Sequence, residues 1–325
     1  MTERPLDGES APAQVVRPLQ RGLTVLRAMS RPSWDRTRPG DLVRATGMAR
    51  STVDRIIGTL DHIGYLRFDG QEAALAPPLM ELGNAYLSAC GLSDALADRV
   101  VQLADAFDES VSLAVPDGAD VRFIAQATRR RTMSLAFRIG DALPAERCAP
   151  GGLFAATWGE KEWRTWRARK ASDPQDENFP AVPPRRLDGM RGEAGTDTET
   201  DFRRRCEQAL RDGWSLDDQL IEPGLIAACV PVRDPDGRTA CALSVVSHTS
   251  RHDGQQLAEL CLPRLREAAA AMENALAVPP PRPARAALNP AGPGTASADG
   301  KDELGSGFLQ SLERGLAVLR TLGEA

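Results

Sequence analysis

The chain lacks the residue patterns from which metal sites and disulfide frameworks are built. Its only three His are dispersed at His62, His248 and His252, and no two of its six Cys are spaced as CxxC. Because zinc sites need grouped Cys and His ligands, we expect no metal centre. Several Cys lie within apolar runs, which is typical of reduced, buried thiols in a cytoplasmic protein.

Membrane and export signals are also missing. No apolar run approaches the ~18–20 residues that span a bilayer, and the opening MTERPLDGESAPAQ is polar and acidic, unlike a secretion signal. We therefore expect a cytoplasmic protein with no membrane partner. With 325 residues, 42% hydrophobic and 26% charged, the chain has room for about two globular domains.

Catalytic signatures do not stand out either. No His, Cys and Asp form a recognisable triad, and no glycine-rich phosphate loop is evident. Asp217 and Asp218 are neighbours, so on an extended segment they point to opposite faces and make a poor acid–base pair. Cys148 lies beside Arg147, but a semi-buried, inert thiol is favoured over an activated one. We expect no enzyme and no cofactor.

Positive charge is scarce overall but concentrated near the N-terminus. The net charge of -5 gives no general affinity for nucleic acid. Residues 17–67, however, contain ten Arg, no Lys, four Asp and no Glu, so this segment carries +6 and the remainder carries -11. Any affinity for nucleic acid should therefore lie in this segment.

The same segment has the pattern of a winged helix-turn-helix. The spacing predicts a first helix from Leu19, a short helix over residues 41–46 that Gly47 ends, and a second helix from Arg50 to about Ile63. The inner stripe of that second helix is Val53, Ile56, Ile57 and Leu60. YLRFDGQEAALA then alternates around an Asp-Gly turn and predicts a small hairpin, the wing.

Side chains suited to DNA gather at the start of this second helix. Arg can bind guanine through two hydrogen bonds, and hydroxyls or helix-terminal N–H groups can bind phosphate. The expected DNA-binding residues are Arg44, Arg50, Ser51, Thr52, Arg55 and Arg67. The alternative is a plain three-helix subdomain with solvated arginines. The turn, the Ser-Thr start and the local charge together favour DNA binding.

The rest of the chain alternates between helical and strand patterns. A hairpin of two buried strands is predicted at residues 225–246, and a long loop over 171–199. Further predicted segments are helices over 80–89, 94–107, 202–211 and 253–277, a strand pair over 110–127 and a strand over 132–137.

One nonamer occurs twice. LQRGLTVLR at 19–27 returns as LERGLAVLR at 312–320, with seven of nine positions identical. We interpret residues 307–325 as the truncated first helix of a second winged-helix unit, and the chain as the first part of a tandem fusion. Without the rest of its domain, this helix should be either loosely placed or held in a neighbouring first-helix groove.

These motifs resemble the IclR family of transcriptional regulators. The matching segments are LQRGLTVLRAM, DLVRATGMARSTVDRIIGTLDHIGYL, RIGDALP and GWSLDDQLIEPGLIAACVPVRDPDGRTACALSVVSHTSR. The last is similar to the branch that senses aromatic acids such as protocatechuate and 4-hydroxybenzoate. The resemblance covers about residues 16–278 and implies an α/β (α+β) protein, with a winged helix-turn-helix, a linker helix and a GAF-like effector-binding domain.

The resemblance also implies an organisation and partners. The expected partners are double-stranded operator DNA, a small organic acid, and further copies in a homodimer or tetramer, or a covalent pseudo-dimer in a tandem protein. The expected segments are a disordered tail (1–16), the winged helix-turn-helix (17–78), the linker helix (79–92), the effector-binding domain (93–278), a Pro/Gly-rich linker (279–306) and the truncated helix (307–325).

By residue match, the family's effector site falls on residues of three segments. They are Ala149, Pro150, Asp217, Leu225, Ala227, Ser244 and Val246. Pro150 has no N–H to offer an anion, and Ala227, Val246 and Gly152 replace residues that are usually more polar. The pocket should therefore be a poorer carboxylate site than its relatives'. The alternative function is a dimerising ligand-binding or partner-titrating module with a degenerate pocket and no DNA readout.

Overall fold

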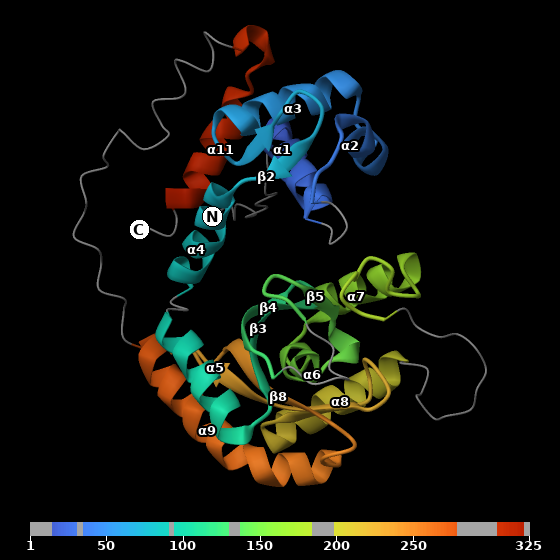
Figure 1. Cartoon of the computed structure of the whole chain (residues 1–325). Coiled ribbons are helices and arrows are strands. Elements are labelled where there is room, and N and C mark those ends of the chain that lie inside the picture. Colours follow the sequence, from blue (N-terminus) through green and yellow to red (C-terminus); the bar gives the residue numbers. More distant parts are fainter. Residues whose placement is uncertain are drawn as a thin grey trace, which may run out of the picture. The chain divides into compact units, whose positions relative to one another are not determined.

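The computed structural model describes residues 15–30, 35–90, 94–129, 137–183, 198–277 and 304–321 (Figure 1). The chain forms two compact units. Met1–Cys90 and Pro281–Ala325 make the helical unit, and Gly91–Pro280 makes the sheet unit. Over the described ranges, no helix is both long and apolar enough to cross a membrane. The expected combination of an N-terminal helix-turn-helix with a mixed helix-and-sheet domain is confirmed.

The helical unit is built around the predicted helix-turn-helix. Gly47, at φ 67°, ends the second helix and turns the chain into the third. The predicted stripe of the third helix is at most 1% exposed, as the periodicity requires. The elements are α1 (Arg17–Met29), α2 (Pro39–Thr46), α3 (Arg50–His62), β1 (Leu66–Phe68), β2 (Ala73–Leu75), η1 (Pro77–Leu79), α4 (Met80–Ala89), η4 (Gly305–Gly307) and α11 (Gln310–Thr321).

Helix α11 packs inside this unit, against α1, α3 and α4 (Figure 1). Leu312 and Leu316 are fully buried in the same core cluster as Val25 and Leu60. Two outcomes were expected for the repeated nonamer, loose placement or packing in a first-helix groove, and the structure has the packed arrangement. The groove that holds the helix belongs to the chain's own first helix.

The sheet unit has one six-stranded antiparallel sheet in the order β5-β4-β3-β8-β7-β6. Helices α5 and α9 cover one face, and α6 lies on the other (Figure 1). Its elements are α5 (Asp94–Phe107), β3 (Ser110–Asp117), β4 (Asp120–Ala127), β5 (Ala142–Pro144), η2 (Ala145–Arg147), α6 (Ala149–Ala155), α7 (Glu160–Ser172), α8 (Glu199–Asp212), β6 (Ser215–Asp218), β7 (Leu225–Arg233), β8 (Thr239–His248) and α9 (Gly254–Ala277).

Helix α7 was not predicted from the sequence. Most of its residues are charged or polar, and only Trp163 and Trp166 supply large buried side chains, so a periodic apolar stripe is lacking. The predicted strand at 132–137 lies outside the described residues except for Phe137. The acidic pair Asp217 and Asp218 ends edge strand β6, and the chain turns directly after it at Gln219, at φ 61°.

The seating of α6 can be tested at Gly151. A Cβ there would lie 1.8 Å from the backbone oxygen of Ala145, a contact that no side-chain motion relieves. We expect Gly151→Ala to lower the free energy of unfolding by about 3 kcal/mol or more, measured by urea denaturation with tryptophan fluorescence. The control is Gly83→Ala in α4, where no atom lies within 4 Å. Gly83→Ala should leave the urea midpoint of the sheet unit unchanged. Equal losses of unfolding free energy in the two variants would contradict the prediction.

Candidate functional site

The predicted DNA-binding residues lie on the helix-turn-helix and its hairpin. Arg44 lies near the end of α2, and Arg50, Ser51 and Arg55 lie on the first two turns of α3; all four are exposed, and Thr52 is half-buried. Arg67 is exposed on β1. The fold therefore brings four of these side chains, residues 50, 51, 52 and 55, to one end of one helix.

Two of the predicted arginines pair with neighbouring carboxylates. The Nε of Arg50 donates to both oxygens of Asp54, at 2.8 and 3.0 Å, and Arg44 pairs with Asp41 on α2. The Nε of Arg55 donates to the Gly307 carbonyl instead, at 3.4 Å. Such exposed pairs contribute about 0–1 kcal/mol, so a phosphate or a base can replace the carboxylate at little cost.

Two further arginines support the hairpin. Arg36 pairs with Asp69 at 3.3 Å and Arg38 with Glu72 at 3.2 Å, while Thr37 between them bridges to Ala73. From the sequence alone, both arginines entered the argument only as part of the positive charge of residues 17–67. Their partners are more than 30 residues away, so the pattern gave no signal for this role.

The predicted effector residues meet on the α6 face of the sheet. The strand register places Asp217 opposite Ala227, and Ala227 opposite Val246, in one row across β6, β7 and β8. Ser244 lies one row along, opposite Cys229. Ala227 and Leu225 belong to the same buried cluster as Ala149 of α6. The structure therefore brings together segments that lie up to 97 residues apart in the chain.

Asp217 is the buried charge-bearing group of this row. It is 2% exposed, and its Oδ1 accepts a hydrogen bond from the Leu220 N–H at 2.7 Å. Burial raises its pKa to about 7, although the Leu220 hydrogen bond and the charges of Arg205 and Arg147 act in the opposite direction. Asp218 is exposed, so the two carboxylates point to opposite sides as expected.

Helix α6 begins beside this row. All seven of its residues are buried, and Pro150 stands in its first turn, where it supplies no N–H. A Cβ on Gly152 would lie 2.7 Å from the Ser215 Oγ. The family resemblance made Gly152 a substitution for a more polar residue, whereas the structure uses it for the close approach of α6 to β6.

A buried network of charges holds the loops around α6, and the sequence gave no sign of it. The Nη1 of Arg147 donates to Asp176 at 2.9 Å, and its Nη2 donates to the Ile221 carbonyl at 2.7 Å. Arg169 pairs with both Asp176 and Glu146. Burial opposes ionisation of Glu146, but Arg169 and Lys170 lower its pKa to about 2. The Glu146 carboxylate therefore remains charged at neutral pH.

Cys148 is not activated by its neighbour. It is 6% exposed, and burial raises its pKa well above the usual range. The guanidinium of Arg147 is directed to Asp176 and backbone carbonyls instead. Both features agree with the expectation of an inert thiol.

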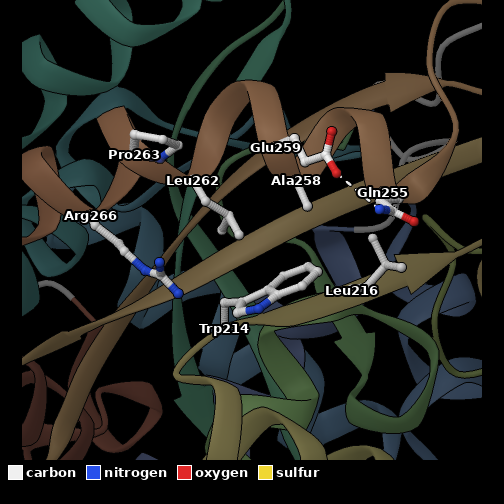
Figure 2. Close-up of a pocket in the computed structure, with 8 residues that line it drawn as sticks. All are labelled: Trp214, Leu216, Gln255, Ala258, Glu259, Leu262, Pro263 and Arg266. Carbon is white, nitrogen blue, oxygen red and sulfur yellow. Dashed lines mark hydrogen bonds between the residues drawn. The ribbon is translucent and has the colours of Figure 1, made fainter.

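A pocket of about 570 Å³ lies between β6 and α9 (Figure 2). Trp214 and Leu216 alternate with Ser215 and Asp217 along the strand, so the pocket lies on the opposite face of the sheet from the Asp217 row. Gln255 and Glu259 of α9 are hydrogen-bonded to each other at its rim, at 2.9 Å. None of the seven predicted effector residues lines it.

Comparisons with known proteins give the chain a family. The IclR helix-turn-helix domain matches residues 18–70, and the bacterial transcriptional regulator IclR C-terminal domain matches residues 185–274. The Pca regulon regulatory protein of Pseudomonas putida is 30% identical over 76% of this chain and 79% of that protein. The p-hydroxybenzoate hydroxylase transcriptional activator of Acinetobacter baylyi is 25% identical over 79% of this chain and 90% of that protein.

Solved structures share the fold. A transcriptional regulator from Rhodococcus sp. RHA1 is 27% identical, with a TM-score of 0.64 over 81% of this chain and 98% of that one. An IclR homolog complexed with 4-hydroxybenzoate, from Microbacterium hydrocarbonoxydans, is 21% identical, with a TM-score of 0.62 over 80% and 98%. These proteins are regulators rather than enzymes. With both domains matched and 30% identity over three quarters of its length, the chain belongs to the IclR family of transcriptional regulators.

Proposed function

We propose that this regulator binds operator DNA through the N-terminal end of α3, and that a small aromatic carboxylic acid bound on the α6 face of the sheet controls it. The observation that carries the DNA part is the set of exposed arginines and hydroxyls on the first two turns of α3. A helix presented in this way fits the major groove. The wing contributes Arg67 to the DNA backbone.

The effector part rests on the polar atoms beside the Asp217 row. Ser112 and Ser244 face each other across β3 and β8. Among the described residues, the Ser112 Oγ is buried without a hydrogen-bond partner, and the Cys229 thiol, a weak donor, is the one group that bonds the Ser244 Oγ. Hydroxyls without partners favour a polar ligand. One relative is named as the transcriptional activator of p-hydroxybenzoate hydroxylase, and an IclR homolog was crystallised with 4-hydroxybenzoate. These names suggest the class of the ligand.

The DNA interface predicts the behaviour of a double variant. We expect Arg50→Ala with Arg55→Ala to weaken binding to the DNA upstream of its own gene by about 30-fold or more. The salt dependence of log K should also become shallower by roughly 0.9 for each phosphate that the variant no longer neutralises. Fluorescence anisotropy at several salt concentrations measures both. Arg233→Ala with Arg238→Ala, at exposed positions of the sheet unit, removes the same charge and should change neither. Unaltered binding by the α3 variant would exclude α3 as the reading helix.

The effector site predicts a pH dependence centred on Asp217. Because the pKa of Asp217 is raised to about 7, this carboxyl is mostly neutral at pH 6 and mostly charged at pH 8, where it repels a bound carboxylate. The Kd for 4-hydroxybenzoate should therefore be up to about tenfold lower at pH 6 than at pH 8. Isothermal titration calorimetry measures it.

Matched variants isolate this group. Asp217→Asn should bind the acid with little pH dependence, whereas Asp218→Asn, at the exposed neighbour, should keep the wild-type profile. A pH-independent Kd in the wild type would remove Asp217 from the site. No heat with any aromatic acid would favour a degenerate pocket.

A further inference from the structure

Two stripes of side chains run side by side along α9. One packs in the interior of the sheet unit, where Leu257, Cys261 and Leu265 are fully buried at helical spacing. The other faces the pocket between α9 and β6, and consists of Gln255, Ala258, Glu259, Leu262 and Arg266. This second stripe and the facing side chains of Trp214 and Leu216 enclose a space that the core packing leaves unfilled. We call it the α9–β6 pocket.

Small residues keep the α9–β6 pocket open. A Cβ on Gly254 would lie 2.9 Å from the Leu216 Cδ2, so this glycine lets β6 lie directly against the start of α9. Ala258 is 4% exposed and lines the pocket with a single methyl group, while the indole of Trp214 is half-buried. The volume of about 570 Å³ is in the range of sites for small organic molecules.

Opposite charges stand at the two ends of this pocket. Glu259 and Arg266 are both exposed, and their seven-residue separation places them about 10 Å apart along the helix axis. The Gln255 Nε2 donates to Glu259 at 2.9 Å, and the Arg266 Nη2 donates to the Asp212 carbonyl at 3.3 Å. Over the described residues, neither charge forms an ion pair. Figure 2 shows Trp214 between these two ends.

Pro263 adds a backbone acceptor at the Glu259 end. It stands inside α9 and has no N–H, so the Glu259 carbonyl cannot receive the usual helical hydrogen bond from residue 263. Both residues line the pocket. A hydrogen-bond donor at this end therefore meets a carboxylate and a backbone carbonyl, whereas an anion is favoured only at the Arg266 end.

We propose that the α9–β6 pocket binds a planar aromatic carboxylate that carries a hydroxyl group at the end opposite its carboxylate. The ring lies on the Trp214 indole, where aromatic stacking adds to the burial of apolar surface. The carboxylate pairs with Arg266, and the hydroxyl donates to the acceptors of Glu259. The reverse orientation places the ligand carboxylate beside the Glu259 carboxylate, so charge repulsion selects one orientation.

This site is distinct from the one proposed on the α6 face. Along β6, Leu216 points into the α9–β6 pocket and Asp217 points to the opposite face of the sheet. The two sites therefore share a strand but no side chain. The inference stands independently of the DNA and effector proposals, and Asp217→Asn separates the two sites experimentally.

The experiment observes Trp214 directly. Full-length protein is labelled with 5-fluorotryptophan, and the fluorine NMR signal of Trp214, one of five Trp in the chain, is assigned by its loss in Trp214→Phe. The probe is 4-hydroxycinnamate, which is planar along its length. Its matched control is 4-methoxycinnamate, which has the same ring and carboxylate but no hydroxyl donor.

We expect 4-hydroxycinnamate to shift the Trp214 signal saturably, with the same Kd in the parent and in Asp217→Asn. 4-Methoxycinnamate should bind at least about threefold more weakly, because it cannot donate to Glu259. Arg266→Gln should weaken binding of 4-hydroxycinnamate at least about fivefold, since a charged hydrogen bond is lost. Arg264→Gln, which is exposed on the same helix but does not line the pocket, should leave the Kd unchanged.

Three titration results would overturn the proposal. They are an unshifted Trp214 signal at millimolar 4-hydroxycinnamate, an equal Kd in Arg266→Gln and Arg264→Gln, and loss of the shift in Asp217→Asn, which would assign the binding to the other face. A Trp214 signal that depends on protein concentration without any acid refutes it equally, because a second copy then covers the pocket. Far-UV circular dichroism checks that each variant is folded. Arg266→Lys, which keeps the charge, should retain more affinity than Arg266→Gln.

Discussion

The absence of side chains at Gly151 and Gly152 lets α6 lie directly on its supports. The backbone of Ala145 and the Ser215 hydroxyl occupy the space that two Cβ atoms would need. Because α6 is then buried along its whole length, the short helix η2 before it is buried too, and Glu146 and Arg147 enter the interior. Buried charges must be paired. The ion pairs that connect the loops around α6 therefore follow from the close packing of α6 against Ala145 and Ser215.

The same packing shapes the candidate effector site. Small residues line the sheet beneath α6, and a ligand placed there must replace contacts that α6 already makes. A ligand shifts a conformational equilibrium only by its differential affinity for the two states. For the effector proposed above, the buried Ser112 and Ser244 hydroxyls would favour the liganded arrangement, because a polar ligand would give them hydrogen bonds that they lack among the described residues. An ionised Asp217 would oppose an anionic ligand, so the proposed balance would depend on pH.

Local sequence patterns predicted the buried stripe of α3, through its helical periodicity, and the end of α2 at Gly47. The family resemblance named Asp217, Ala227 and Val246 as effector residues, and the strand register places them in one row. The hydrogen bonds of Arg147 join groups 29 to 74 residues apart, and no spacing rule reaches that far. Helix α7 was missed because its two buried Trp stand among charges. The repeated nonamer was visible, but which groove holds it depends on tertiary contacts.

The segment that seats α11 also contacts the recognition helix. The Arg55 Nε donates to the Gly307 carbonyl at 3.4 Å, the Leu309 N–H donates to the Thr59 Oγ1 at 3.0 Å, and Phe308 packs edge-on against His62 at 5.5 Å. Because the Arg55 guanidinium cannot donate fully to both the Gly307 carbonyl and a base edge, the DNA contact proposed for Arg55 is linked to the packing of α11. Linkage is reciprocal. By whatever factor packed α11 lowers the proposed DNA affinity, bound DNA therefore disfavours the packing of α11 to the same extent.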